Sequence, residues 1–98
     1  MDILSKRYAN FLKFLKDLGL GSEPYVRELN QVNSIIFVTK LREGVDKYKQ
    51  GSDKEKIDKG FDEMIKELNI NPNDYKKENI TKFKRFLLYF YLTSKELF

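Results

Sequence analysis

The side chains that could do chemistry in this chain are Tyr, Lys, Asp and Glu, because it contains neither His nor Cys. His and Cys supply most general bases, strong nucleophiles and transition-metal ligands near neutral pH. Carboxylates and lysines can move protons when burial tunes them, yet none stands isolated in an apolar stripe here. The turn at 19–21 lacks the lysine and the spacing of a phosphate-binding loop. The sequence therefore predicts a protein that is not an enzyme and has no cofactor.

Two groups of oxygen ligands are the candidates for a metal site. Asp58 and Asp62 lie one helical turn apart and could hold a divalent cation weakly, but the lysines between them favour a solvated surface. Asparagines at 69, 71 and 73 have the alternate spacing of the first ligands in a calcium loop. The glycine and the bidentate glutamate that such a loop requires are missing. The sequence predicts no metal site.

The segment 64–75 resembles the helix-turn-helix pattern of bacterial and archaeal DNA-binding domains. In that pattern a helix ends in Leu, and a Gly- or Asn-like turn residue, an apolar residue and a capping residue follow, often before Pro. The matching positions here are Leu68, Asn69, Ile70, Asn71, Pro72 and Tyr75. The resemblance implies a DNA-binding motif at about 57–80. Four residues would then face the major groove: Asn73, Asp74, Lys76 and Lys77.

An ordinary helix end followed by a proline-started turn fits the same segment. Met64 is larger than the small residue with which the two helices of the motif cross closely. No Arg, the commonest specific base reader, lies in the expected reading helix. We favour this plainer interpretation, keep DNA binding as the alternative, and expect a short extra helical turn near 72–77.

Apolar residues at helical spacing predict four main helices. The first follows a stripe from Leu4 to Leu18 and ends at Gly19, the position of a left-handed glycine before an apolar residue. The third begins at Ser52, which has capping-box spacing to Glu55. The last runs from about 79 to 96. With short connections these helices predict an all-α fold, a compact bundle in which residues 1–98 form a single domain.

The second helix is expected to begin with Ser22 as its cap and to continue to about residue 50. Its centre, 34–39, is apolar on all sides and β-branched, so a short strand is the alternative there. A helix of this kind should lie in the middle of the fold, and Asn33 would then be a buried amide. Gly44 and Gly60 predict either a close approach of the second and third helices or a local break.

The formal net charge of +4 is concentrated at both ends of the chain. If the first and last helices are neighbours, their basic residues could form one surface that meets phosphates; simple solvation of the bundle is the commoner explanation. The basic residues of the first helix are Lys6, Arg7, Lys13 and Lys16. The candidate nucleic-acid contacts in the second half are Asn73, Lys76, Lys77, Lys84 and Arg85.

The run 86–92 is apolar over the whole circumference of the last helix. Either this helix lies at the centre of the core or one face is covered by a second copy or another protein. The candidate interface residues are Phe86, Tyr89, Leu92 and Phe98. The leading prediction is a non-enzymatic interaction module, acting as a homodimer or through a protein partner, and a small DNA-binding protein is the alternative.

The expected location of this module is the cytoplasm, without membrane association. The segment 1–16 mixes charges into its apolar positions, unlike a signal peptide. The seven apolar residues of 86–92 are far fewer than the ~20 that cross a membrane.

Overall fold

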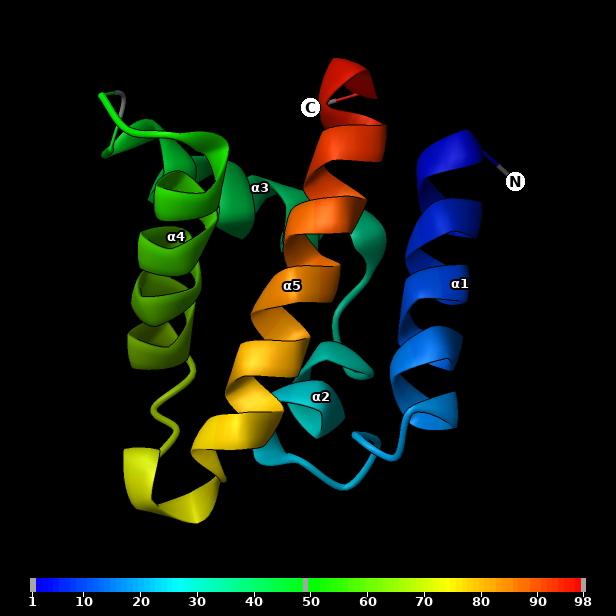
Figure 1. Cartoon of the computed structure of the whole chain (residues 1–98). Helices are drawn as coiled ribbons and strands as arrows, with labels where there is room; N and C mark the ends of the chain where they lie inside the picture. Colours follow the sequence, from blue (N-terminus) through cyan, green and yellow to red (C-terminus); the bar gives the residue numbers. More distant parts are fainter. Residues whose placement is uncertain (1, 49, 98) are drawn as a thin grey trace.

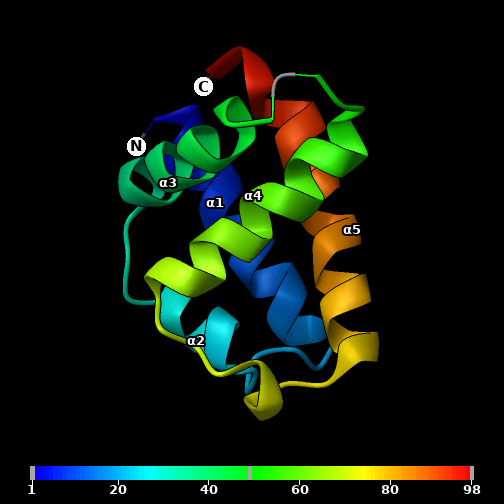
Figure 2. The ribbon, with the colours of Figure 1, turned by 90° about the vertical axis from the view of Figure 1, so that its left-hand side faces the viewer.

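Five α-helices in chain order make up the computed structural model, which describes residues 2–48 and 50–97. In Figure 1, α5 lies between α4 and α1 and runs opposite to both, with α2 and α3 behind them. Figure 2 shows α5 on one side and α2 and α3 on the other. The helices are α1 (Ile3–Asp17), α2 (Pro24–Leu29), α3 (Ser34–Asp46), α4 (Asp53–Glu67) and α5 (Lys77–Ser94), with 3₁₀ turns η1 (Pro72–Asp74) and η2 (Lys95–Leu97).

The all-α prediction is confirmed, since the described residues contain no strand. Four of the five helices are longer than two turns, and α2 has six residues. The short helical turn expected near 72–77 is present as η1. Within the described chain, no helix is long and apolar enough to cross a membrane.

Helix ends follow the sequence signals closely in α1 and α4. Both helices end at a residue with positive φ, Gly19 at 83° and Asn69 at 55°. The next amide then donates back to a carbonyl five residues earlier, as from Leu20 to Leu15 at 3.0 Å. At the start of α4, the Ser52 hydroxyl accepts the backbone N–H of Glu55 at 3.2 Å.

The prediction of one long second helix is wrong, because the chain breaks between α2 and α3. Asn33 causes the restart: its exposed side chain accepts the Ile36 backbone N–H at 2.9 Å and caps α3. It is therefore not a buried amide. Glu23, and not Ser22, is the N-cap of α2.

The segment 34–39 is helical, as preferred over a strand, but it does not lie in the middle of the fold. Ile35 and Ile36 are 67% and 42% exposed, whereas Phe37 and Val38 are buried. Only one side of α3 therefore faces the core. Its Phe37 ring packs against Phe90 of α5 with centroids 5.6 Å apart.

The core is aromatic and joins all five helices. Tyr25 of α2 packs against Phe61 of α4 and Phe83 of α5, with ring centroids 5.7 and 4.8 Å apart. Tyr8 of α1 stacks on Phe37 of α3 at 4.9 Å. These buried rings set the spacing between the helices, and α1 meets α5 through side chains of this size.

The closest approach between helices lies where α3 crosses α4. A Cβ atom at Gly44 would stand 2.8 Å from the Cα atom of Gly60, a distance that real Cβ atoms essentially never show. The two backbones are thus in direct contact, as the glycine positions suggested. The break near Gly44 does not occur, because α3 continues to Asp46.

Candidate functional site

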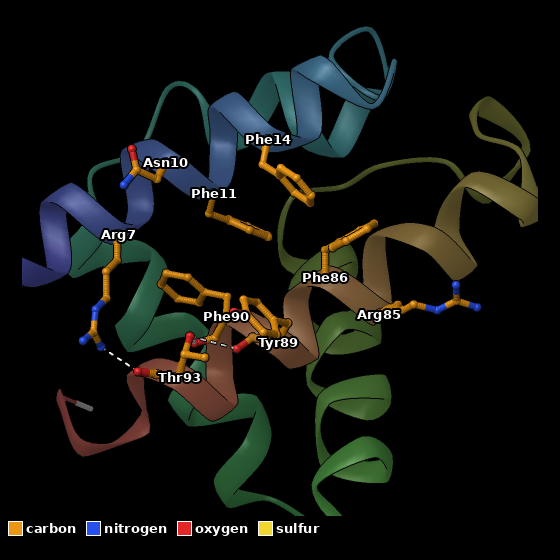
Figure 3. A pocket seen from close by; sticks show the side chains of 9 residues that line it. All are labelled: Arg7, Asn10, Phe11, Phe14, Arg85, Phe86, Tyr89, Phe90 and Thr93. Atoms are coloured by element: carbon orange, nitrogen blue, oxygen red, sulfur yellow. Dashed lines mark hydrogen bonds between the residues drawn. The ribbon is translucent and has the colours of Figure 1, made fainter.

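A groove of about 730 Å³ lies between α1 and α5, within the ~300–1,000 Å³ range of typical ligand sites. Figure 3 shows it between the two helices. Its lining side chains stand at steps of three and four residues along each helix, so each set forms one side of its helix. The residues of α1 are Arg7, Asn10, Phe11 and Phe14, and those of α5 are Arg85, Phe86, Tyr89, Phe90 and Thr93.

The floor and one end of this groove are aromatic. Phe11 and Phe90 form the floor, both buried, with ring centroids 5.1 Å apart. At one end Phe14 meets Phe86 edge to face at 4.9 Å. Phe14 remains 47% exposed and Tyr89 68% exposed. The apolar lining is therefore continuous from the core to the surface.

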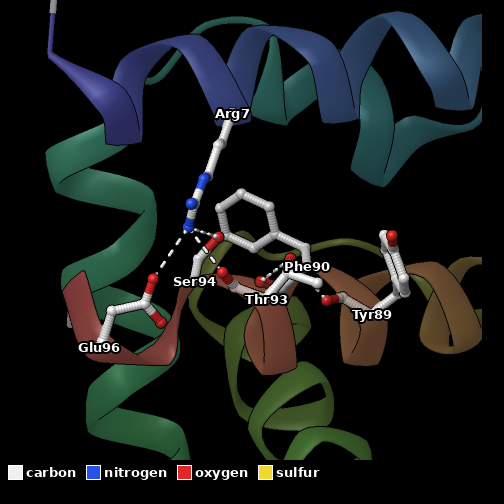
Figure 4. A network of polar contacts seen from close by, with 6 residues as sticks. All are labelled: Arg7, Tyr89, Phe90, Thr93, Ser94 and Glu96. Carbon is white, nitrogen blue, oxygen red and sulfur yellow. Dashed lines mark hydrogen bonds and ion pairs between the residues drawn. The ribbon is translucent and has the colours of Figure 1, made fainter.

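The other end of the groove is closed by Arg7, whose guanidinium ties α1 to the end of α5 (Figure 4). Its Nη1 atom donates to the Thr93 carbonyl at 2.6 Å and to a Glu96 carboxylate oxygen at 3.2 Å. The backbone N–H of Glu96 and then the hydrogen bond from Arg7 hold the pKa of the Glu96 carboxyl below its ordinary value. This end is polar and fixed, in contrast to the open aromatic end.

The structure divides the apolar run 86–92 between core and surface. Leu87 and Phe90 are buried, while Phe86 and Tyr89 line the groove. Leu92 is 46% exposed but is not part of the lining. The fourth candidate interface residue, Phe98, lies outside the described residues.

The α1 side of the groove was missed by sequence reasoning. Phe14 lies off the Leu4–Leu18 stripe that marks the buried side of α1. The signal available in the sequence was that Phe14 is an apolar residue beyond those that complete the stripe. The partners of Arg7, at the far end of the chain, leave no such signal.

The expected recognition helix of a helix-turn-helix motif does not form, which corrects that prediction. Residues 72–74 make a single 3₁₀ turn, closed when the Asn71 side chain accepts the Asn73 backbone N–H at 2.9 Å. Asn73 is exposed on that turn, Lys76 is the N-cap of α5, and Lys77 is its first residue. These residues follow one another along a bend and share no helical face.

Two neighbouring candidates on α5, Lys84 and Arg85, have different surroundings. The Lys84 ammonium lies 2.7 Å from an Asp58 oxygen and 3.4 Å from one of Asp62. It also stands 5.4 Å above the Phe61 ring. Lys84 therefore neutralises the two carboxylates that were considered for a metal. Arg85 is exposed at the edge of the groove.

Outside the groove, two polar side-chain groups at the start of α2 are buried. Glu23 Oε2 and the Tyr25 hydroxyl are buried without a hydrogen-bond partner among the described residues. Burial raises the pKa of Tyr25, and the Glu23 charge adds to the rise. Asn79 donates to the other Glu23 oxygen at 2.8 Å, which ties α5 to the start of α2. No group of three metal-ligating side chains occurs within residues 2–48 and 50–97.

Comparisons with protein-family models, with curated proteins and with solved structures give no match to this chain.

Proposed function

We propose that this protein is a non-enzymatic interaction module that receives a helical segment of another protein in the groove between α1 and α5. The observation that carries the proposal is the continuous apolar path from the buried Phe11–Phe90 floor to the exposed rings of Phe14 and Tyr89. Large apolar side chains at the surface are costly unless something covers them, and a pair of adjacent helices is a common cradle for a third.

Three features support a protein segment as the ligand. The groove is bounded by helices rather than loops, so its walls are preorganised. Its lining offers aromatic rings and arginine, which are enriched at the centres of protein interfaces. Among the described residues that line it there is no carboxylate or lysine to activate the hydroxyls of Tyr89 and Thr93, which supports binding rather than catalysis. We place this activity in the cytoplasm, because a chain without Cys does not depend on disulfides, which the reducing cytoplasm disfavours.

A display library of helical peptides, selected on the folded protein, tests this function. The peptides that survive should bind wild type, lose at least tenfold in affinity for Tyr89→Glu, and keep their affinity for Ile35→Glu. Ile35 is the matched control, since it is 67% exposed against 68% for Tyr89 but lies on α3, away from the groove. Circular dichroism should show both variants folded. No enrichment above the Tyr89→Glu background would contradict the proposal if light scattering also shows a monomer.

Nucleic-acid binding is the second candidate, favoured by one observation. The helices α1 and α5 lie side by side and are both basic. Arg7 and Lys84 are held in ion pairs, and the other basic side chains of the two helices form no ion pair among the described residues: Lys6, Lys13, Lys16, Lys77, Lys82 and Arg85. Such a surface could follow a phosphate backbone without the helix-turn-helix geometry. If it does, affinity for a short AT-rich duplex should fall steeply with salt and fall further in Lys76→Glu/Lys77→Glu. Fluorescence polarisation measures both, and unchanged binding in the double variant removes the contacts predicted from sequence.

A further inference from the structure

We propose, resting on the function above, that the segment received by the groove is an acidic amphipathic helix. Its apolar side chains would enter between the Phe14–Phe86 contact and the Arg7 end, and its carboxylates would meet Arg85. Because the floor of the groove is apolar, the groove suits a helix with one apolar face. Because the charges around the groove are positive, the polar face of that helix should be negative.

The lining of the groove has two arginines and no carboxylate among the described residues. Arg7 is compensated by Glu96 at 3.2 Å. Arg85 makes no ion pair or hydrogen bond with any side chain that the structure describes. One positive charge at the groove edge is therefore available to a partner, and an arginine can bind a carboxylate through two parallel hydrogen bonds.

The adjacent Lys84 differs from Arg85, because its charge is already neutralised within the molecule. Lys84 faces α4, where Asp58 and Asp62 already satisfy it. Helix α4 has six acidic residues against four basic, and four of the six form ion pairs with lysines in or directly after α3 and in α5. The other side of α5 faces α1, which has four basic residues and one acidic. Arg85 lies between these two sides, because it also lines a hollow that includes Asp58. Asp58 is paired with Lys84, and no carboxylate of the described residues forms an ion pair with Arg85.

A second copy of this chain is the less suitable occupant for the same reason. Two copies that meet through this face would bring the basic helices α1 and α5 of one copy against those of the other. Like charges placed opposite each other cost free energy and suppress that association. An acidic helix removes the repulsion and supplies the missing ion pair.

The test uses two synthetic four-turn peptides with the same Leu and Phe positions, one with Glu on its polar face and one with Lys. Fluorescence polarisation at moderate salt should show the Glu peptide binding wild type at least tenfold more tightly than the Lys peptide. Arg85→Glu should reverse this preference, whereas Arg42→Glu should leave it unchanged. Arg42 is an exposed arginine on α3, outside the groove.

The outcomes separate this inference from the function on which it rests. Reversal by Arg85→Glu alone supports an acidic helix. Equal binding of both peptides, or tighter binding of the Lys peptide, overturns the acidic helix; the function stands if Tyr89→Glu still abolishes that binding. A dimer that Tyr89→Glu dissociates also overturns it, because the occupant is then a second copy. If neither peptide binds and the chain is a monomer, the acidic helix is overturned, and the function fails as well only if the peptide library also shows no enrichment.

Discussion

Two helix pairs in this small protein are built in opposite ways. Where α3 crosses α4, the backbones touch at Gly44 and Gly60, and a single added Cβ atom would collide at 2.8 Å. Where α1 lies beside α5, phenylalanine rings separate the helices and leave a groove of about 730 Å³. At the glycine crossing the first pair leaves no room for a ligand, whereas the second pair has room along its length that its own side chains do not fill.

The two pairs also differ in how their edges are held. Lysines of α3 reach carboxylates of α4, as in Lys40–Glu67 at 3.0 Å and Lys47–Glu63 at 3.2 Å. Helix α1 is anchored by two polar side chains: Arg7, at one end of the groove, and Tyr8, whose hydroxyl donates to the Leu29 carbonyl at 2.6 Å. Neither contact lies at the open aromatic end of the groove, so α1 stays in place without closing the gap to α5 there.

The largest effect should come from breaking the α3–α4 contact with Gly44→Ala. The new methyl group meets backbone, which cannot turn aside as a side chain can, so the helices must separate. We expect a loss of about 2–3 kcal/mol in unfolding free energy, the scale of an overpacked core. Urea denaturation followed by circular dichroism measures it.

Gly60→Ala is the matched control for this prediction. A Cβ atom there would lie 3.5 Å from Val45, which is ordinary contact, and alanine favours the helix by up to ~1 kcal/mol over glycine. The variant should therefore be as stable as wild type or slightly more stable. Equal losses of unfolding free energy in both variants would contradict this prediction. The distance between the helices, and not the position of the added methyl group, would then decide the loss.

The anchor of α1 is tested by Tyr8→Phe. The variant removes the shorter of two hydrogen bonds to the Leu29 carbonyl, at 2.6 Å, and leaves the one from the Val32 backbone N–H at 3.4 Å, which should cost about 1 kcal/mol. Tyr25→Phe is the control, because it removes a buried hydroxyl that has no hydrogen-bond partner among the described residues. It should be neutral or stabilising in the same denaturation experiment. A similar cost for both would show that the Tyr25 hydroxyl pairs with Glu23 in solution.

Local signals in the sequence predicted the helices well where one residue decides the outcome. Gly19, Asn69 and Ser52 each act on a single turn, and each prediction is confirmed. The break before α3 was missed because Asn33 can serve either as a buried amide or as a helix cap, and the choice depends on tertiary packing. The same ambiguity made 34–39 look central, although Ile35 and Ile36 face solvent.

The candidate site was predictable only on the α5 side. An apolar run without a polar face signals surplus apolar surface, which identified Phe86 and Tyr89. Its α1 wall depends on which helices become neighbours, and Arg7 meets Thr93 and Glu96 across almost the whole chain. No local spacing carries that information. The helix-turn-helix resemblance failed for a related reason, since Pro72 can start a helix or a single 3₁₀ turn.

The smallest expected effect is a loss of stability at acid pH. It comes from the carboxylates at the polar edges of the two helix pairs. A hydrogen bond from Lys47, together with its charge, lowers the pKa of Glu63 at the α3–α4 edge. The pKa of Glu96, at the α1–α5 end, is lowered as well. A carboxyl with a lowered pKa stabilises the folded chain above its ordinary pKa, and this contribution is lost as the pH falls through the ordinary carboxylate range to the lowered value.

Glu63→Gln and Glu96→Gln should therefore each reduce the drop in thermal midpoint between neutral and acid pH, and neither should change the midpoint much at the acid end. Both carboxylates are at the surface, so each effect should be smaller than that of Tyr8→Phe. Lys47→Gln should reproduce most of the effect of Glu63→Gln, since Lys47 is the main partner of Glu63 while Lys66 and the Tyr48 hydroxyl remain. The double variant should match Glu63→Gln alone. If the fall in thermal midpoint is unchanged in all these variants, the edge carboxylates contribute nothing to stability. The two helix pairs then differ only in the backbone contact of one and the phenylalanine rings that separate the helices of the other.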